Sequence, residues 1–549
     1  MKSLPIGIST FRFLIEDKLV YVDKTGIILP LVREKGRYFL SRPRRFGKSL
    51  LVDTFKELFE GNEPLFRGLA IHDSWDWSRK FPVIKIDFVS GVSTSRAALD
   101  ERIIHLLKEN AARLGIDMNW DTDLAGLFEN LISGAAQVSQ SPVVVLVDEY
   151  DKPLLDNIED PAKAMEIREG LKNFYSPLKR LDGILQFVFL TGVSKFSKVN
   201  IFSGINNLMD LTLSPAYATI CGYTQGDLET SFAEHLAGVD REQMKLWYNG
   251  YSFLGEAVYN PFDILLFIQN NHVFRNYWFE TGTPTFLVKL MQKNGYFLPD
   301  LAKIEVGEEI LSSFDLETIQ PTTLLFQTGY LAIKKVATMM GRQVYTLGFP
   351  NLEVKIAFSD FLIGSYAGIV QDRIRYQRGV YDALLAGDLA ALEASLRRLF
   401  SGIPWRNFTN NDLAEYEGYY ASVLYAFFSA ITCTVTAEDI NNHGQADLTI
   451  RLADNIYVME IKTVQDASPG TAAPVTVAPS VAPTQLAVAV GTDPATDGGQ
   501  AGNVALAQIR ARGYADKYLG QAGVRVFELG LVFSMAQRNL VQFAGVERS

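Results

Sequence analysis

Short apolar runs alternate with helical patterns in the N-terminal part of the chain. Val143–Val147 is continuously apolar, Leu185–Leu190 is apolar except for Gln186, and Val83–Phe88 is a further strand-like run. Between them, apolar residues recur at helical spacing over Arg96–Leu114. A strand that is apolar on both faces is typical of a parallel sheet covered by helices on both sides. The pattern therefore predicts an α/β domain with a mainly parallel sheet over residues 1–213.

The pattern changes twice further along the chain. Helical periodicity dominates residues 214–375, interrupted by aromatic-rich turns such as Trp247–Tyr251, which predicts a mostly helical middle domain. Residues 376–549 begin with helices and end with strand-like runs, so we expect a second α/β domain. Its expected elements after the first helices are strands at Ile431–Thr436, Asp447–Leu452 and Ile456–Ile461, a helix at Val504–Leu519 and a strand at Phe527–Phe533.

One segment of this last domain has the composition of a flexible insertion. Residues 464–500 contain five prolines and no Lys or Arg, and Ala, Val, Thr and Gly make up most of the rest. Such a segment buries too little apolar surface to offset the entropy of ordering it. We therefore expect a disordered insertion there.

Composition and charge exclude several classes of protein. The chain has 52 Lys and Arg against 62 Asp and Glu, a net charge of −10, so a surface coated overall by nucleic acid is excluded, although a local basic groove is not. Two cysteines cannot form a disulfide framework or a zinc cluster. The sequence contains neither a signal-peptide core nor a run of about 20 apolar residues, so we expect a cytoplasmic protein with no membrane partner.

The first candidate site is a phosphate-binding loop. Gly47, Lys48 and Ser49 lie between an expected strand at Tyr38–Leu40 and an expected helix. Glycine allows close backbone approach, lysine reaches the β- and γ-phosphates, and the serine hydroxyl binds Mg²⁺. The backbone amides flanking Phe46, in Arg45 and Gly47, complete the expected ATP contacts. The usual loop pattern is incomplete because Arg42 occupies its first glycine position, so a chance Gly-Lys-Ser loop stays an alternative.

Carboxylates follow a second strand about 100 residues later. The apolar run Val143–Val147 leads directly into Asp148 and Glu149, as in strands that hold Mg²⁺ and polarise water. We assign Asp148 to the metal and Glu149 to the general base, against the alternative of a buried strand that ends in solvated acids. Thr191 ends a third strand and is either a γ-phosphate sensor or an ordinary turn residue. Open α/β sheets bind ligands at the carboxyl ends of their strands, where all these residues lie.

Three arginines lie beside the expected loop. Arg42, Arg44 and Arg45 are candidates for clamping phosphates or for contacting the nucleotide of a neighbouring subunit. Ion pairing with local acidic residues is the alternative. The sequence does not separate these interpretations.

The second candidate site is a carboxylate pair with a lysine. Asp447 lies 13 residues before Glu460, and Lys462 follows at the position that shares a strand face with Glu460. A tight turn at Ala453–Asn455 would pair the two strands and bring Asp447 near Glu460, giving hard oxygen ligands for Mg²⁺. Lys462 would then orient or deprotonate the attacking water in phosphodiester hydrolysis.

Further residues extend this second site, and an alternative remains. Glu417 on the preceding helix is a further candidate ligand through water, and Gln508 on the last helix is a candidate for lining a DNA groove. The alternative is an ordinary charged hairpin with a Glu–Lys surface pair.

These motifs together resemble a known family. The strings that carry the resemblance are Leu4–Gly7, Tyr21–Thr25, Ser41–Ser49, Val147–Pro153, Leu190–Phe196, Gly204–Leu208, Tyr248–Tyr251, Tyr259–Pro261, Gly444–Leu448, Glu460–Lys462 and Ala507–Ile509. Over nearly its full length the chain resembles the bacterial and archaeal AAA-ATPase-like proteins that carry a C-terminal PD-(D/E)XK nuclease-superfamily domain.

The resemblance implies specific folds and roles. It implies a P-loop NTPase domain, a lid-like or winged-helix-like middle domain and a restriction-endonuclease-like C-terminal domain. It places Lys48 and Ser49 in the nucleotide loop, and Asp447, Glu460 and Lys462 in the nuclease triad. Arg42 looks like the family's own form of the loop. Two features depart from the nuclease pattern, because Gln445 stands where arginine is frequent and the 464–500 insertion directly follows the triad.

The leading hypothesis is an ATPase coupled to a Mg²⁺-dependent nuclease that acts on nucleic acid, with DNA favoured over RNA. A nucleotide-gated binding module with an inactive nuclease fold is the alternative, and a switch of the STAND type is a third interpretation. A homo-oligomer is left open by all three.

Overall fold

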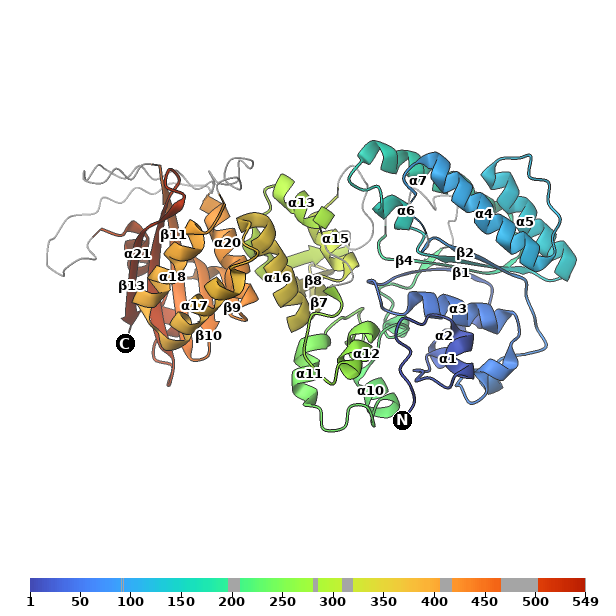
Figure 1. Cartoon of the computed structure of the whole chain (residues 1–549), viewed down its shortest axis with the longest axis horizontal. Helices are drawn as coiled ribbons and strands as arrows, with labels where there is room; N and C mark the ends of the chain where they lie inside the picture. Colours follow the sequence, from blue (N-terminus) through green and yellow to red (C-terminus); the bar gives the residue numbers. More distant parts are fainter. Residues whose placement is uncertain are drawn as a thin grey trace. The chain divides into compact units, whose positions relative to one another are not determined.

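The computed structural model describes residues 1–89, 91, 93–195, 208–279, 285–308, 319–404, 417–465 and 502–548 (Figure 1). The chain divides into two compact units. The first unit comprises Met1–Leu287 with Glu305–Val354, and the second comprises Val288–Ile304 with Lys355–Ser549. The three-domain division proposed from the sequence is finer than this and stays a prediction.

The first unit is built on a parallel five-stranded sheet with the strand order β2-β3-β4-β1-β5. Every neighbouring pair in this sheet is parallel. All residues of the central strand β3 are buried, which explains its continuous apolar run. The expected parallel α/β fold is therefore confirmed. The strands are β1 (Gly36–Ser41), β2 (Val83–Asp87), β3 (Val143–Asp148), β4 (Leu185–Gly192) and β5 (Met209–Asp210).

Helices cover both faces of this sheet (Figure 1). One face carries α1 (Phe11–Glu16), α2 (Thr25–Arg33) and α3 (Lys48–Phe59). The other carries α4 (Arg96–Leu114), α5 (Leu124–Ser139), α6 (Lys152–Leu155) and α7 (Pro161–Tyr175). The short helix α8 (Pro177–Arg180) packs against α5. Helix α4 has the bounds that its periodicity predicts, because Ser95 caps its start and Gly115, at φ 66°, ends it.

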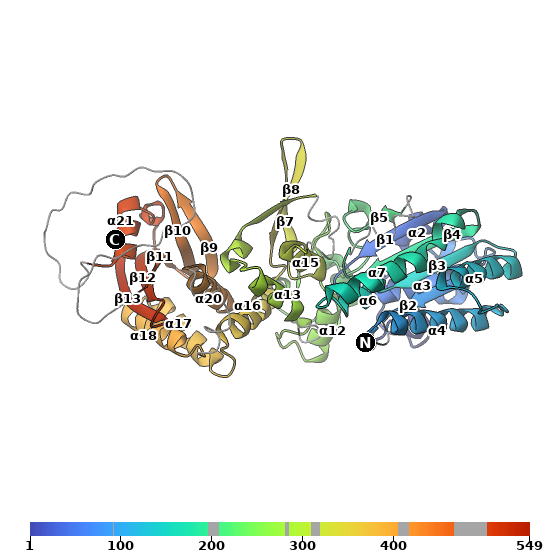
Figure 2. The same cartoon turned by 90° about the horizontal axis from the view of Figure 1, so that it is seen from above.

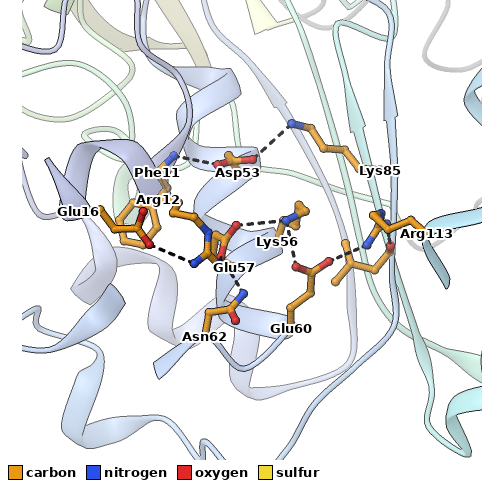
Figure 3. A network of polar contacts seen from close by, with 11 residues as sticks. Phe11, Arg12, Glu16, Asp53, Lys56, Glu57, Glu60, Asn62, Lys85 and Arg113 are labelled. Atoms are coloured by element: carbon orange, nitrogen blue, oxygen red, sulfur yellow. Dashed lines mark hydrogen bonds and ion pairs between the residues drawn. The ribbon is translucent and has the colours of Figure 1, made fainter. Parts of the chain in front are cut away.

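A network of polar contacts fixes α3 on its outer side (Figure 3). Asp53, which is 8% exposed, accepts a hydrogen bond of 2.8 Å from the Phe11 amide and lies 3.5 Å from Lys85 Nζ. The buried Glu57 pairs with Arg12 at 2.8 Å. Because these partners come from α1 and β2, the helix that follows the predicted phosphate loop is held by its neighbours on both sides.

The rest of the first unit is largely helical, as expected for the middle of the chain. An apolar core joins Val20 and Val22 of the N-terminal segment to Leu228, Phe232 and Tyr248. A small sheet with the order β6-β8-β7, which the sequence did not predict, also belongs to this part. The elements are α10 (Gln225–Ser231), α11 (Arg241–Tyr248), α12 (Pro261–Gln269), β6 (Ile304–Gly307), α15 (Pro321–Thr328), β7 (Ala332–Met339) and β8 (Arg342–Gly348). Helix α13 (Thr285–Lys293) begins in the first unit and passes into the second at Val288.

The second unit contains a mixed sheet with the order β13-β12-β11-β10-β9. Its β11–β12 pair is parallel, and the other three pairs are antiparallel. The strands are β9 (Thr434–Asn441), β10 (Gly444–Leu452), β11 (Asn455–Val464), β12 (Arg525–Ser534) and β13 (Asn539–Arg548). The helices are α16 (Leu352–Ala367), which begins in the first unit, and α17 (Arg373–Ala386), α18 (Leu389–Ser401), α20 (Glu417–Ala430) and α21 (Val504–Arg512).

The two faces of this sheet have different cores. On one face, Ile456 and Val458 pack against Leu506 and Ile509 of α21. On the other, Phe533 stacks on Tyr420 of α20 with ring centroids 4.4 Å apart. The mixed α/β character of the C-terminal domain is thus confirmed.

Local bounds differ from the predicted ones in several places. The strand expected at Ile431–Thr436 is β9, Thr434–Asn441, and β10 starts at Gly444 and not at Asp447. Helix α21 ends at Arg512, not at Leu519, because Gly513 adopts a left-handed conformation at φ 57°. Strand β11 continues through Val464, which the sequence assigned to the insertion. Strand β13 was not predicted. The expected disorder of the insertion concerns residues 466–500, which lie outside the described residues.

Candidate functional site

The loop between β1 and α3 has the backbone shape of a helix N-terminal binding site. Gly47 caps α3 with φ 91°, a conformation that glycine adopts at no steric cost. A side chain at Gly47 would meet no atom within 4 Å, so the backbone angle, not space, requires glycine. Lys48 opens the helix, and its Nζ donates to the carbonyl oxygens of Arg42 and Pro43, both at 3.1 Å. The ammonium group thus lies over the loop that the sequence predicted to bind phosphates.

The predicted acidic partners lie beside this lysine. Glu149 Oε1 is 3.5 Å from Lys48 Nζ. Asp148 is fully buried, and neither of its carboxylate oxygens accepts a hydrogen bond from the described residues. Burial raises the pKa of Asp148 to about 6, and the nearby Ser49 hydroxyl and Lys48 ammonium oppose that rise. A buried carboxylate without a hydrogen-bond donor, next to a serine hydroxyl, fits the hard oxygen ligands that Mg²⁺ prefers.

Thr191 lies near the carboxyl end of β4, the middle strand of the parallel sheet. Its Oγ1 donates to the Leu40 carbonyl at 2.9 Å, across the β1–β4 pair in which Leu40 and Thr191 are opposite each other. The hydroxyl proton therefore ties β4 to the strand that leads into the loop. Its assignment as a γ-phosphate sensor stays a prediction.

Asp151 is a site residue that the sequence reasoning missed. Its buried carboxylate accepts hydrogen bonds from Ser194 N at 2.7 Å and Ser194 Oγ at 2.6 Å, and burial raises its pKa to about 6. A Cβ at Gly192 would lie 2.3 Å from Asp151 Oδ1, so only glycine allows this approach. The link fixes the end of β4 relative to Glu149. The sequence feature that could have identified Asp151 is that it is a further carboxylate, three residues after Asp148.

Both interpretations of Arg42 are wrong. This side chain is 0% exposed and neither reaches outward to a phosphate nor pairs with an acid. Its guanidinium donates to the carbonyls of Thr212 and Tyr217, at 2.9 and 3.0 Å, and lies 3.8 Å from the centre of the Phe253 ring. Burial lowers its pKa to about 10. Arg42 thus joins the loop to the 212–217 segment, at the position where the usual loop has glycine.

The other predicted loop residues have distinct surroundings. Arg45 is exposed, adopts φ 67° and places its guanidinium 5.0 Å from the Phe262 ring centre. Phe46 is buried and meets Tyr251 edge to face at 4.8 Å. The Phe46 ring therefore anchors the loop in the apolar core, and its expected role rests on the flanking backbone amides.

Trp278 holds the outer side of the loop. Its indole Nε1 donates to the Arg44 carbonyl at 3.2 Å, and its backbone amide donates to Glu353 Oε1 at 2.8 Å. Glu353 belongs to the first turn of α16. Asp263, also buried, faces Glu353, and burial with this second carboxylate raises the pKa of Asp263 well above its ordinary value. Two buried carboxylates side by side disfavour the state in which both are ionised.

A small apolar cavity adjoins Gly47. Its volume is about 70 Å³. Residues from the loop, the N-terminal segment and the 220–223 segment line it, including Phe46, Leu50, Tyr21, Val22 and Tyr223. The sequence analysis did not identify this cavity, because its walls are separated by about 200 residues along the chain.

The second candidate site has the predicted hairpin geometry. Strands β10 and β11 pair through the Ala453–Asp454 turn, with Leu448 opposite Met459 at the last paired position. The Ile461 amide donates to Asp447 Oδ2 at 2.6 Å, and Lys462 Nζ lies 2.7 Å from Glu460 Oε1. Glu460 is 1% exposed, whereas Asp447 and Lys462 are half-buried. The structure thus brings the three predicted residues together.

Helix α21 contributes Gln508 to this cluster. Gln508 Nε2 donates to Glu460 Oε1 and lies 3.4 Å from the Tyr514 hydroxyl. The sequence placed Gln508 in a DNA groove, but it contacts a catalytic candidate directly. Close packing of α21 on β12 makes this possible, since a Cβ at Gly530 would lie 2.4 Å from the Leu506 amide.

The side chains at the second candidate site offer the type of donor atom that the predicted Mg²⁺ requires. Asp447 and Glu460 supply the carboxylate oxygens that suit Mg²⁺. In the described part of the chain, no group of three or more His, Cys, Asp or Glu side chains is arranged to hold a metal ion. The side chain of Glu417, the third proposed ligand, lies outside that part.

Both cysteines, Cys221 and Cys433, are buried and free. Among the helices described, none is long and apolar enough to cross a membrane.

Comparison with known proteins identifies two domains. Residues 5–202 match the family described as "Predicted AAA-ATPase", and residues 415–543 match the PD-(D/E)XK nuclease superfamily. The two matches define an ATPase–nuclease architecture.

A relative covers nearly the whole chain. A protein of Azotobacter chroococcum mcd 1, described as "Uncharacterized protein in vnfD 5'region", is 44% identical over 543 residues, which are 99% of this chain and 98% of that protein. The chain therefore belongs to the family of AAA-ATPase-like proteins with a C-terminal PD-(D/E)XK nuclease-superfamily domain.

Proposed function

We propose that this protein binds and hydrolyses ATP at the β1–α3 loop and uses the nucleotide to control a Mg²⁺-dependent nuclease site that acts on DNA. The observation that carries the nuclease half is the juxtaposition of Asp447, Glu460 and Lys462 on one hairpin, with the Ile461 amide 2.6 Å from Asp447 Oδ2. Lys48 beside Glu149, at 3.5 Å, supports the ATPase half.

The residues of the ATPase site have separate tasks. Lys48 would move from the loop carbonyls to the β- and γ-phosphates, which offer it charged acceptors. Ser49 and Asp148 would hold Mg²⁺, which neutralises phosphate charge when bound. Glu149 would orient the attacking water and accept its proton. The apolar cavity beside Gly47 is where we place one edge of the base.

The residues of the proposed nuclease site also have separate tasks. Asp447 and Glu460 would hold Mg²⁺, which polarises the scissile phosphate when bound. Lys462 would orient the attacking water and help to remove its proton. Gln508 would keep the Glu460 carboxylate in place through its side-chain amide, acting as a positioning residue.

The nuclease assignment is tested by cleavage of supercoiled plasmid with Mg²⁺ and ATP. We expect Lys462→Ala to lower the rate by at least about 100-fold, because removal of one acid–base group costs typically 10²–10⁴-fold. The matched control is Lys303→Ala, which changes an exposed lysine of the same unit and should leave the rate unchanged. Plasmid bound but never cut by the wild type under any divalent ion would favour the nucleotide-gated binding module instead.

The ATPase assignment is tested by calorimetry with Mg²⁺-ATP. We expect Lys48→Ala to abolish measurable binding, whereas Lys108→Ala, on the exposed side of α4, retains it. Absence of binding heat for the wild-type protein would contradict the ATPase half and leave the nuclease half standing.

A further inference from the structure

A two-stranded hairpin stands off the body of the first unit. It consists of β7 (Ala332–Met339) and β8 (Arg342–Gly348), and Figure 2 shows it projecting from the elements around it. The turn is made by Met340 at φ 51° and Gly341 at φ 75°. Two consecutive left-handed residues give the tight turn whose twist matches that of paired strands. The hairpin is therefore a defined ribbon up to its tip.

The tip of this hairpin is apolar and solvent-exposed. Met340 is 99% exposed and Met339 is 54% exposed, and Val336 further down is 45% exposed. Single exposed apolar residues are common, but two adjacent methionines at the end of a projecting ribbon form a local apolar contact surface. Methionine is a flexible side chain that adapts to irregular partners.

The charge on the hairpin is of one sign. Residues 332–348 contain Lys334, Lys335 and Arg342 and no Asp or Glu, in a chain whose net charge is −10. Lys334 Nζ is bound to the Pro350 carbonyl at 2.7 Å, at the base of the ribbon. Glu305 and Glu308 lie on or next to β6, and the Tyr345 hydroxyl of β8, on the half of the hairpin away from its tip, donates to Glu308 Oε1 at 3.4 Å.

The strand register places the remaining cations on one face. Met339 is paired directly with Arg342, and directly opposed residues of an antiparallel pair share a face. Lys335 lies four residues before Met339 on the same strand and therefore also on that face. One face of the ribbon thus presents Lys335, Met339 and Arg342 together.

The spacing of these groups fits duplex DNA. At roughly 3.3 Å per residue, Lys335 lies about 13 Å behind the tip. The major groove is about 12 Å wide and about 8.5 Å deep, and it admits a two-stranded β-ribbon. A tip at the groove floor therefore leaves the flexible Lys335 side chain at the phosphates of the groove rim.

We propose that the β7–β8 hairpin is a DNA-binding wing, whose methionine tip and Arg342 enter the major groove while Lys335 contacts a backbone phosphate. The choice of DNA as the partner rests on the proposed function; the surface itself rests on the hairpin's exposure, register and charge. The wing holds the duplex and takes no part in cleavage.

The test is the binding of the full-length protein to a fluorescent 30-base-pair duplex in EDTA, measured by anisotropy over a range of salt concentrations. We expect Lys335→Glu/Arg342→Glu to weaken binding about 10- to 100-fold at 0.1 M salt. Its slope of log affinity against log salt should fall by at least about 0.9, since the lost Lys335 phosphate contact alone removes about 0.9. Met339→Ser/Met340→Ser should weaken binding with the slope unchanged, because this variant removes no charge.

The matched control is Lys163→Glu/Lys172→Glu, which makes the same charge change on α7 of the same unit. Equal affinity and slope for the hairpin charge variant and this control would overturn the wing. So would a hairpin variant that changes the sedimentation mass of the protein and not its DNA affinity, because a second copy of the chain would then be the occupant.

Different experimental outcomes would contradict the proposal of a DNA-binding wing and the proposal of a nuclease. Cleavage of plasmid by hairpin variants at the wild-type rate and affinity would remove the wing and keep the nuclease. Hairpin-dependent binding by a wild-type protein that never cuts DNA would keep the wing and remove the nuclease. Absence of any duplex binding by the wild type at 50 mM salt would overturn the wing.

Discussion

Buried carboxylates without matching cations concentrate around the nucleotide loop. Asp148 and Asp151 both have pKa values raised to about 6 by burial, and burial beside Glu353 raises the pKa of Asp263 well above its ordinary value. An ionised carboxylate removed from water costs free energy unless a bound cation or several donors compensate it. Buried acids with raised pKa values cluster at functional sites, so these carboxylates agree with the proposed nucleotide site.

At the residue scale, Asp148→Asn should stabilise the protein and abolish Mg²⁺-dependent nucleotide binding. The folded-state pKa is raised, so the folded protein holds the proton more tightly, and its stability falls as pH rises from about 4 to 6. Each tenfold change in proton affinity is worth about 1.4 kcal/mol, so the variant should gain up to about 3 kcal/mol at pH 7.5 and nothing at pH 4. Urea denaturation at the two pH values measures this. Asp117→Asn, at an exposed carboxylate of the same unit, is the control, and an unstabilised Asp148→Asn at pH 7.5 would contradict the burial argument.

Trp278→Phe should weaken nucleotide binding without unfolding the first unit. The change keeps an aromatic ring but removes the indole N–H that donates to the Arg44 carbonyl at 3.2 Å. One such hydrogen bond contributes about 0.5–1.5 kcal/mol, so the dissociation constant for Mg²⁺-ATP should rise about 2- to 12-fold. Calorimetry gives the constant, with Trp247→Phe on α11 as control. Equal constants for the wild type and Trp278→Phe would show that the loop does not depend on this support.

At the scale of elements, the position of α21 on its sheet decides whether Gln508 reaches Glu460. Asn503 caps α21 through the Leu506 amide at 2.9 Å and also donates to the Gly530 carbonyl at 3.1 Å. Arg510 of the same helix lies 3.5 Å from the fully buried Glu528 of β12. These contacts fix α21 on the sheet and thereby place Gln508 beside Glu460.

Gly530→Ala should therefore impair cleavage more than it impairs stability. Its Cβ would lie 2.3 Å from Asn503 Oδ1 and 2.4 Å from the Leu506 amide, so the helix start must shift. We expect a loss of about 1–3 kcal/mol in stability and a fall in plasmid cleavage of at least about tenfold. Gly502→Ala is the control, since a Cβ there meets no atom within 4 Å. Unchanged cleavage by Gly530→Ala would show that Gln508 does not position Glu460.

Whole elements were predicted well where the apolar pattern alone determines them. The run Val143–Val147 is buried on both faces, and the Asp447–Glu460 pairing follows from a short turn, so both could be derived locally. Strand β13 was missed because its half-buried residues lack a clear alternation. The supports of the loop, such as Trp278 on Arg44, join residues 234 positions apart, and no local pattern encodes such a contact. Arg42 was misjudged because sequence shows its charge but not the carbonyls that surround it.

At the scale of the whole molecule, the two sites should be separable by single substitutions. Lys462→Ala should abolish cleavage and retain ATP hydrolysis, because Lys462 and the ATPase residues lie in different compact units. Lys48→Ala should abolish hydrolysis and leave any remaining cleavage insensitive to ATP. Phosphate release and plasmid nicking, measured in the same samples, check both. Cleavage by Lys48→Ala that still rises with ATP would contradict nucleotide control through this loop.

Helix α16 also determines where a different C-terminal domain can be joined to the first unit. Its first turn carries Glu353, which accepts the Trp278 amide at 2.8 Å and belongs to the first unit, although the rest of the helix belongs to the second. A chimera joined before Leu352 would replace Glu353 with a residue of the new domain. The buried Trp278 amide would then lose its hydrogen-bond acceptor. A graft made after Val354 keeps it. Any exchange of the C-terminal domain in this architecture therefore has its natural junction inside the first turn of α16, after Val354.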